Sequence, residues 1–464
     1  MFGGAAAVTS VALLAVGLCT YGIACGNRDP RPRGTLEDVL ALRERSDLNV
    51  LFILVDTLRA DRLGAYGYAR DTSPNLDALA ASGIRFARQV SQSSWTKCSM
   101  ASLWTGLYPA RTRVLRSHDV LSPGARVPAE IFQEAGFRTA AVWRNSWIAP
   151  NFGFSQGFEI YHNPPPRQGA RARVDRAENP NLTLAGTDAD TIDSAREFLR
   201  VHGQERWFLY LHMMDVHQYV YSEETALFGT NYSDSYDNSI RWVDNLLGYL
   251  FTELAQRDLL ARTLIVFSSD HGEAFGEHDG EGHARNVYGE VTTTPLIIAP
   301  PFRLEPAITV EARSENVDLW PTVLELVGLP PLVDADGQSL VPQIVAAAQG
   351  ESAPDTDGTA FAQLDQTWGR TGMKPAPMVA VNQGRWRLIY RALTPRRSEL
   401  YDTWEDPLEQ RNLAGEQPAV LEELNERARA YLQSDPPPWG EQTPTVEIDE
   451  LQLNQLRALG YGVR

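Results

Sequence analysis

The 464-residue sequence contains few cysteines, and their positions limit what they can do. Only three are present, Cys19, Cys25 and Cys98. The first two fall in an apolar N-terminal stretch typical of a leader, so no internal disulfide framework can form if that stretch is separate from the fold. An apolar core must then stabilise the fold. The composition allows one, because 43% of the residues are hydrophobic and 22% are charged.

Positive charge is also scarce. The formal net charge is -17, and the sequence has no long cluster of lysine and arginine. Nucleic acid phosphates would be repelled by such a chain unless it carried a local basic patch. We therefore expect no nucleic acid partner.

The N-terminal region, residues 1–34, is predicted to be a signal, lipoprotein or membrane-anchor segment followed by a linker. Residues 5–25 are almost entirely apolar and small. Ile23, Ala24 and Cys25 resemble a bacterial lipoprotein cleavage site, which would leave Cys25 lipidated. The preceding residues lack positive charge, and arginines follow the apolar run instead, so an uncleaved anchor stays open. We expect an exported protein of the cell envelope, periplasmic or on the outer surface, tethered to the membrane.

Beyond the leader, residues 48–345 alternate apolar strand patterns with helical periodicity, which is typical of an α/β fold. An amphipathic helix is predicted around residues 236–254, where apolar residues recur at intervals of three and four. Strands are predicted at residues 50–55, 138–143, 207–212, 263–268 and 295–298.

Residues 359–464 are predicted to form a small C-terminal α+β subdomain, after a polar linker at 350–358. Strands at 378–381 and 386–390 and a closing helix at 419–432 support this division. Residues 163–190 lack periodicity. They are interpreted as a surface loop near the site or as a disordered insertion.

Two of the predicted buried strands end in acids of the kind that bind metals. Residues 50–55 are followed by Asp56, and residues 263–268 by Ser269, Asp270 and His271. Ligands of open α/β sheets bind outside the carboxyl ends of the strands, so these side chains can converge on one cation. The sequence therefore predicts a metal-dependent enzyme.

A nucleophile is expected near such a cation. Residues 94–106 contain a short helix pattern closed by Gly106, so the residues before it lie at a helix N-terminus, which favours an anion. Thr96, Cys98 and Ser99 are all chemically capable of attack.

Several motifs occur in an order that resembles the sulfatase family of the alkaline phosphatase superfamily. The resemblance implies a large, mixed and mostly parallel sheet sandwiched by helices, with a small C-terminal α+β subdomain. It covers nearly everything after the leader. The matching segments are residues 55–68, 96–109, 269–273, 276–278, 317–322, 400–414 and 456–461.

The resemblance also implies roles at the metal site. Asp56, Asp270 and His271 are expected to bind a divalent cation, which could be Ca, Mn, Zn or Mg. Aligned backward from Thr105 and Gly106, the family's formylglycine position falls on Thr96.

The residue at that position departs from the family pattern. Threonine cannot become formylglycine, so none is expected, and Thr96 is predicted to bind the cation and to attack the ester itself. Cys98 and Met100 stand where the family usually has proline and arginine. Cys98 is a competing nucleophile, or simply a core cysteine.

Other polar residues receive roles from the same resemblance. His217 and His283 are predicted to be catalytic, either contacting the transferred group or protonating the leaving oxygen. Lys97 and Arg144 are predicted to bind the substrate's oxygens. A second metal site built from His212, His278 and Asp215 stays open.

The sequence therefore predicts a metal-dependent hydrolase of sulfate or phosphate esters that acts through Thr96. One alternative is a phosphoethanolamine- or phosphoglycerol-type transferase with a covalent Thr96 intermediate, and another is a catalytically inactive sulfatase-like binding protein. The natural substrate is expected to be a sulfate or phosphate ester, with an envelope glycan or lipid as the candidate carrier of the ester.

Overall fold

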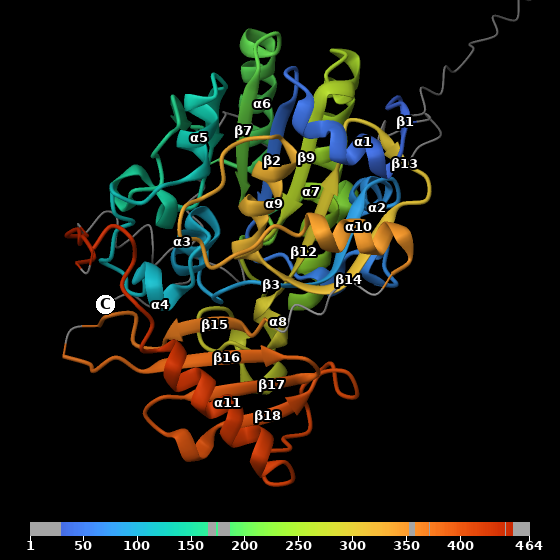
Figure 1. Ribbon diagram of the computed structural model, residues 1–464. Helices are drawn as coiled ribbons and strands as arrows, with labels where there is room; N and C mark the ends of the chain where they lie inside the picture. The colour runs from blue at the N-terminus through green and yellow to red at the C-terminus, as the bar shows by residue number, and fades with distance from the viewer. Residues whose placement is uncertain are drawn as a thin grey trace, which may run out of the picture.

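The computed structural model describes residues 29–165, 173–174, 186–351, 358–370, 372–440 and 442–448, and Figure 1 shows their arrangement. The predicted leader lies outside these residues up to position 28. No helix in the described ranges is long and apolar enough to span a membrane.

The fold is organised around an eight-stranded sheet with the order β14-β3-β12-β9-β2-β7-β4-β5. Only β12 runs antiparallel to its two neighbours, so the sheet is mixed and mostly parallel, which confirms the predicted fold class. Its strands are β2 (Asn49–Val55), β3 (Ile84–Val90), β4 (Arg138–Val142), β5 (Ile160–His162), β7 (Trp207–Met213), β9 (Thr263–Ser268), β12 (Thr293–Ala299) and β14 (Ile308–Glu315).

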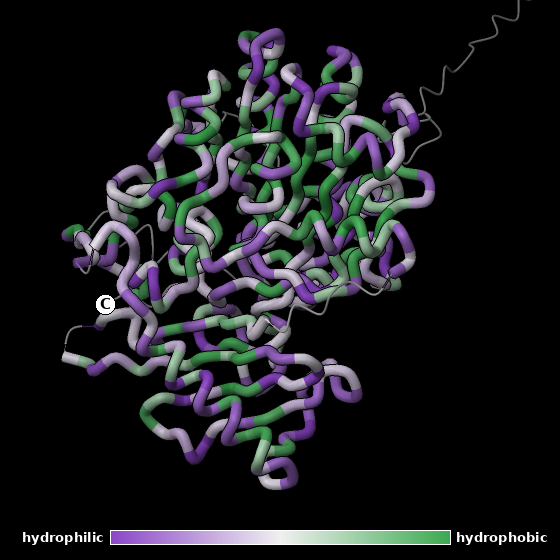
Figure 2. Tube along the Cα trace, in the orientation of Figure 1, coloured by the Kyte–Doolittle hydropathy of each residue, from purple (hydrophilic) through white to green (hydrophobic). Residues whose placement is uncertain are grey.

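Strand β2 shows why the sheet is buried on both faces. Every residue from Asn49 to Val55 is buried, and alternate side chains enter two different apolar clusters. The tube in Figure 2 is accordingly most hydrophobic along the central strands. One face is covered by α2 (Pro74–Ala80), α6 (Asp188–His202) and α7 (Tyr232–Gln256), and the other by α1 (Leu36–Ala41), α3 (Thr96–Thr105), α5 (Pro128–Glu134), α9 (Leu319–Leu326) and α10 (Val341–Gln349).

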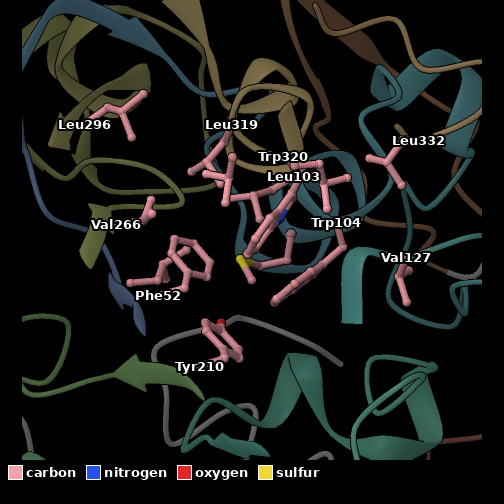
Figure 3. Close-up of a cluster of buried hydrophobic side chains, with 14 of the residues drawn as sticks. Phe52, Leu103, Trp104, Val127, Tyr210, Val266, Leu296, Leu319, Trp320 and Leu332 are labelled. Atoms are coloured by element: carbon pink, nitrogen blue, oxygen red, sulfur yellow. The ribbon is translucent and has the colours of Figure 1, made fainter. Parts of the chain in front are cut away.

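Aromatic side chains pack helix α3 against the sheet, as Figure 3 shows. Trp104 of α3 stacks on Trp320 of α9 with ring centroids 5.1 Å apart, and it meets the edge of Tyr210 at 5.0 Å. Phe52 of β2 completes this group, with its ring 5.9 Å from that of Trp104. Large buried rings contribute much of the apolar area of a core, so these contacts fix α3 relative to β2.

The predicted C-terminal subdomain forms a second, smaller sheet that lies below the large one in Figure 1. Its four antiparallel strands are covered by one helix, which contacts β16 and β17. The elements are β15 (Ala360–Asp365), β16 (Pro377–Gln383), β17 (Trp386–Arg391), β18 (Glu399–Asp402) and α11 (Pro418–Tyr431).

The fold begins earlier than the predicted start at residue 48. Arg31 is buried and donates a hydrogen bond to the Pro300 carbonyl oxygen at 2.9 Å. Strand β1 (Arg33–Gly34) pairs in parallel with β13 (Arg303–Leu304). Part of the predicted linker therefore belongs to the catalytic unit, because a buried arginine and a short strand anchor it there.

The predicted loop at 163–190 ends earlier than expected, since α6 already begins at Asp188. Within the loop, β6 (Arg173–Val174) pairs with β8 (Val220–Tyr221). The other residues between 165 and 186 lie outside the described part of the chain.

Shorter elements complete the description. They are α4 (Pro109–Thr112), α8 (Gly289–Thr292) and a two-stranded hairpin of β10 (Ala274–Phe275) and β11 (Glu281–Gly282).

Candidate active site

The structure brings Asp56, Asp270 and His271 together at the carboxyl ends of β2 and β9. These strands are adjacent and parallel, so the residues that follow them emerge at one edge of the sheet. One potential ligand atom from each residue lies within 4.8 Å of the others. All three residues are 0% exposed. Together they form what we call the acid–histidine cluster.

The cluster has the properties of a cation site. The Asp56 Oδ1 and Asp270 Oδ2 atoms are buried and accept no hydrogen bond from the described residues. Burial, together with the negative charge of Asp56, raises the pKa of Asp270 to about 6. Buried carboxylate oxygens that lack a donor are normally paired with a cation or bound to metal. Two carboxylates and an imidazole suit a divalent ion.

The hydrogen bond of His271 fixes which ring nitrogen can act as a ligand. Its Nδ1 lies 3.0 Å from the Gly272 carbonyl oxygen, which can only accept, so Nδ1 carries the proton. In the neutral ring Nε2 then keeps its lone pair, and this atom lies 3.1 Å from Thr96 Oγ1. A backbone acceptor on the remote nitrogen is the usual way to orient a metal-binding histidine.

Thr96 is the first residue of α3, and its hydroxyl enters the cluster. Oγ1 lies 3.4 Å from Asp56 Oδ2, in addition to its contact with His271. Ser99, one turn later, donates a hydrogen bond to the Asp270 carbonyl oxygen at 2.6 Å and ties α3 to the end of β9. The helix has no side-chain N-cap, so its first backbone N–H groups face the same region and favour an anion.

Asn145 is a member of the site that the sequence interpretation missed. Its Nδ2 donates hydrogen bonds to Asp56 Oδ2 at 2.6 Å and to Thr96 Oγ1 at 3.3 Å. Its Oδ1 accepts a hydrogen bond from the Trp147 backbone N–H, which holds the amide in place. Its position just after β4 could have identified it from the sequence, because polar residues that follow parallel strands reach this edge of the sheet.

His212 supports the acid–histidine cluster through hydrogen bonds. Its Nε2 donates to Asp56 Oδ2 at 3.0 Å, and its Nδ1 accepts from the Tyr210 hydroxyl at 2.6 Å. Both ring nitrogens are therefore used within the protein. Burial opposes ionisation of Asp56, but His217, His212 and His271 together hold the pKa of this carboxyl below its usual range.

The second metal site that the sequence left open does not assemble. Asp215 pairs with Arg144, at 2.6 Å. His278 contacts Glu290 Oε1 at 3.0 Å and the Glu409 carbonyl oxygen at 2.8 Å. The three candidates are held by separate partners, and the acid–histidine cluster is the single group in the described residues that could hold a metal.

His217 and His283 lie beside the cluster. The His283 ring centroid is 4.7 Å from that of His271 and 4.9 Å from that of His217. Burial lowers the pKa of His217 to about 4 and that of His283 to about 3, so both rings are neutral near pH 7. The missed residue Glu273 contacts His283 Nδ1 at 3.1 Å and orients it. The sequence signal that could have identified Glu273 was its position three residues after Asp270.

The hydrogen-bond partners of Arg144 include buried carboxylates outside the acid–histidine cluster, and its contact with substrate stays a prediction. Its Nη1 donates to Asp188 Oδ1 at 2.8 Å and to Asp215 Oδ1 at 2.6 Å, and both carboxylates are fully buried. Asp215 lies two residues before His217, and Arg144 lies one residue before Asn145. The ion pairs therefore join the segments that carry these two site residues.

Removing this guanidinium is expected to destabilise the protein strongly. Arg144→Met leaves two buried carboxylates without their cation, and breaking a buried pair costs about 3–5 kcal/mol. Urea unfolding followed by circular dichroism measures the change. Arg200→Met is the matched control, because Arg200 pairs with Glu197 in full contact with solvent, where an ion pair contributes little to stability. Equal losses in both variants would refute a structural role for the Arg144 pairs.

Lys97 is also held by groups outside the cluster. Its Nζ donates to the Ser117 and Asp119 carbonyl oxygens at 2.6 and 2.7 Å, and it lies 4.2 Å from the centroid of the Phe152 ring. The side chain is fully buried, and burial holds its pKa well below the usual range. The predicted contact with substrate is therefore not supported by its position.

Cys98 has the surroundings of a core residue. Its Sγ lies 3.9 Å from the Gln363 carbonyl oxygen, and burial raises the pKa of the thiol to about 12. Reactive cysteines sit in positive, partly exposed environments that favour the thiolate. The competing assignment of Cys98 as nucleophile therefore finds no support in the structure.

Comparison with known proteins places this geometry in a family. A family model described as Sulfatase matches residues 48–329, which is more than half of the chain. The chain belongs to the sulfatase family. A second model, described as N-sulphoglucosamine sulphohydrolase, C-terminal, matches residues 276–433. The predicted membership and the predicted ester hydrolase class are both confirmed.

Individual relatives of this sulfatase-family chain span most of its length. Arylsulfatase K of Xenopus laevis is 23% identical over 419 residues, which cover 77% of each chain. Choline-sulfatase of Rhizobium meliloti is 26% identical over 444 residues, covering 79% of this chain and 82% of the relative. The crystal structure of the phosphonate monoester hydrolase of Agrobacterium radiobacter superposes with a TM-score of 0.66 at 20% identity, covering 87% of this chain and 98% of that one.

Proposed function

We propose that this sulfatase-family protein is a metal-dependent hydrolase of sulfate or phosphate esters whose nucleophile is Thr96. The observation that carries the proposal is the position of the Thr96 hydroxyl. It lies at the N-terminus of α3, within 3.4 Å of both His271 Nε2 and Asp56 Oδ2. The proposal requires no modified residue, because a hydroxyl activated by a neighbouring cation can itself be the nucleophile.

Asp56, Asp270, His271 and Thr96 itself are the residues that would hold the divalent cation. When bound, such an ion acts as a Lewis acid that lowers the pKa of a hydroxyl and neutralises charge on the ester oxygens. The orphaned carboxylate oxygens described above support this assignment. Whether the ion is Ca, Mn, Zn or Mg stays part of the test, because oxygen and nitrogen ligands together suit several of them.

The chain's own residues supply the nucleophile, orient it and transfer the proton. The bond from Thr96 Oγ1 to phosphorus or sulfur forms as the ester bond breaks, and the hydroxyl proton is balanced by protonation of the leaving oxygen. Asn145 orients the hydroxyl. The neutral ring of His217 accepts the Thr96 hydroxyl proton and returns it to the leaving oxygen, and His283 contacts the transferred group. Water then releases the group from Thr96.

The test is a comparison of matched aryl esters: a phosphate diester, a phosphate monoester and a sulfate ester. We expect metal-loaded protein to hydrolyse at least one of them, and Thr96→Ala to abolish that turnover. Turnover that survives in Thr96→Ala would overturn the proposal. If an added alcohol captures the group in place of water, the covalent transferase becomes the better description. Metal binding without turnover of any ester would favour an inactive binding protein.

We also propose an exported protein of the cell envelope, with an ester on an envelope glycan or lipid as its natural substrate. The apolar N-terminal stretch supports the location. Fractionation of cells that produce the full chain tests it, because recovery with the cytosolic proteins alone would contradict export.

A further inference from the structure

An exposed cation, Arg285, follows His283 by two residues, although the chain as a whole is acidic. Arg285, Arg370 and Lys374 are exposed. In the described part of the chain, no carboxylate forms an ion pair with any of these three side chains. An acidic protein has many carboxylates available for pairing, so unpaired cations at the edge of a site indicate a negatively charged ligand.

Arg285 is held rigidly at this position by its backbone neighbours. Ala284, which has a left-handed φ of 57°, donates its N–H to the Ser94 carbonyl oxygen at 2.8 Å. The Ser94 hydroxyl donates to the Asn286 carbonyl oxygen at 2.5 Å. Ser94 stands two residues before Thr96, so the segment that carries Arg285 is tied directly to the segment that carries the nucleophile.

The C-terminal subdomain fixes the same segment from the other side. Gln366 Nε2 donates to the Arg285 carbonyl oxygen at 3.1 Å, and Trp368 Nε1 donates to the Ala284 carbonyl oxygen at 3.1 Å. Trp368 also has a left-handed φ, of 50°. Left-handed backbone at residues other than glycine is strained and tends to mark functional positions. Here two such residues meet.

Arg370 belongs to the same surface. Its guanidinium lies 5.4 Å from the centroid of the Trp368 ring, and Trp368 stacks on Trp95 with ring centroids 6.5 Å apart. Trp95 directly precedes Thr96 in the chain. Aromatic stacking thus joins a second exposed cation to Trp368, which also contacts the segment that carries Arg285.

We propose that Arg285 and Arg370 bind a second acidic group of the substrate, carried by the leaving group. This inference rests on the proposed ester hydrolase function and narrows its substrate class. The substrate is then an ester whose leaving group bears a carboxylate, sulfate or phosphate, as an acidic saccharide does. Guanidinium groups suit all three, because their planar donors match oxyanion geometry.

The test compares two phenyl esters of the preferred type, one with a carboxylate on the leaving ring and one without. For each protein we take the ratio of kcat/KM for the carboxylated ester to that for the plain ester. Arg285→Gln and Arg370→Gln are each expected to lower this ratio roughly threefold to fivefold. High salt should lower it in the wild type, because exposed charges are screened.

Arg397→Gln is the matched control, since Arg397 is an exposed arginine in the C-terminal subdomain with no ion pair in the described residues. Its ratio should equal that of the wild type. An unchanged ratio in Arg285→Gln and Arg370→Gln would overturn the inference and leave the proposed function intact.

Failure of the proposed function would give a different result, because the wild-type protein would then hydrolyse neither ester. The inference is still tested in that event by calorimetry with hydrolysis-resistant aryl phosphonates. The carboxylated phosphonate should bind more tightly than the plain one, and Arg285→Gln should remove the difference. Equal binding of both phosphonates by the wild type would refute the second acidic subsite.

Discussion

Thr96→Ala is expected to lower kcat/KM for the preferred ester by about 10³-fold or more, because loss of a nucleophile removes the covalent route. The residual rate would come from the cation and the surrounding donors alone. The metal content should stay near that of the wild type, since three of the four expected ligands remain. Steady-state kinetics with metal-saturated protein measures the rate, and circular dichroism checks the fold.

Two further variants separate the nucleophile from its neighbours. Thr96→Ser keeps a hydroxyl at the N-terminus of α3 and should retain part of the activity. Cys98→Ala removes the other candidate nucleophile, and it should change kcat/KM by less than about threefold because the thiol is buried and protonated. An active Thr96→Ala variant together with an inactive Cys98→Ala variant would reverse the assignment.

Asp270→Asn is expected to abolish tight metal binding and to lower kcat/KM by about 10³-fold, since both the charge and one ligand are lost. Wild-type protein should contain one equivalent of divalent metal per chain after dialysis, as measured by mass spectrometry of the digested sample. Its thermal midpoint should rise with added metal, because a ligand at 1,000 times its Kd stabilises the native state by about 4 kcal/mol.

The control for this substitution is Asp258→Asn, at the end of α7 and remote from the acid–histidine cluster. Asp258 has a left-handed φ of 56°, which asparagine also tolerates. That variant should keep its metal and its response in thermal midpoint. Two equivalents of metal in the wild type, or a full equivalent in Asp270→Asn, would contradict the single site.

Much of the large sheet could be predicted from sequence because its central strands are buried on both faces. Residues 50–55 and 264–267 are continuous apolar runs, and the structure has β2 and β9 there. The convergence of Asp56 and Asp270 could be predicted because residues that follow parallel strands meet at the carboxyl edge of an open α/β sheet. The antiparallel direction of β12 could not be predicted, because an apolar run has no signal for its direction.

The directions of the charged side chains were the least predictable part of the site. Lys97 and Arg144 sit next to site residues in the sequence, yet both are bound by groups outside the acid–histidine cluster. Lys97 is bound by the Ser117 and Asp119 carbonyls, and Arg144 is bound by buried aspartates. Lys97 follows Thr96 on α3, and adjacent residues on a helix point in different directions, so adjacency in the sequence did not show which groups Lys97 contacts. Asn145 was missed because the residues that it contacts, Asp56 and Thr96, are distant from it in the sequence.

The most direct measurement is mass spectrometry of peptides from protein quenched during the first turnover of the preferred ester. The account predicts that the transferred phosphoryl or sulfuryl group is found on Thr96, and that Thr96→Ala yields no such adduct. A transferred group found on another residue, with Thr96 unmodified, would contradict the assignment of Thr96 as the nucleophile.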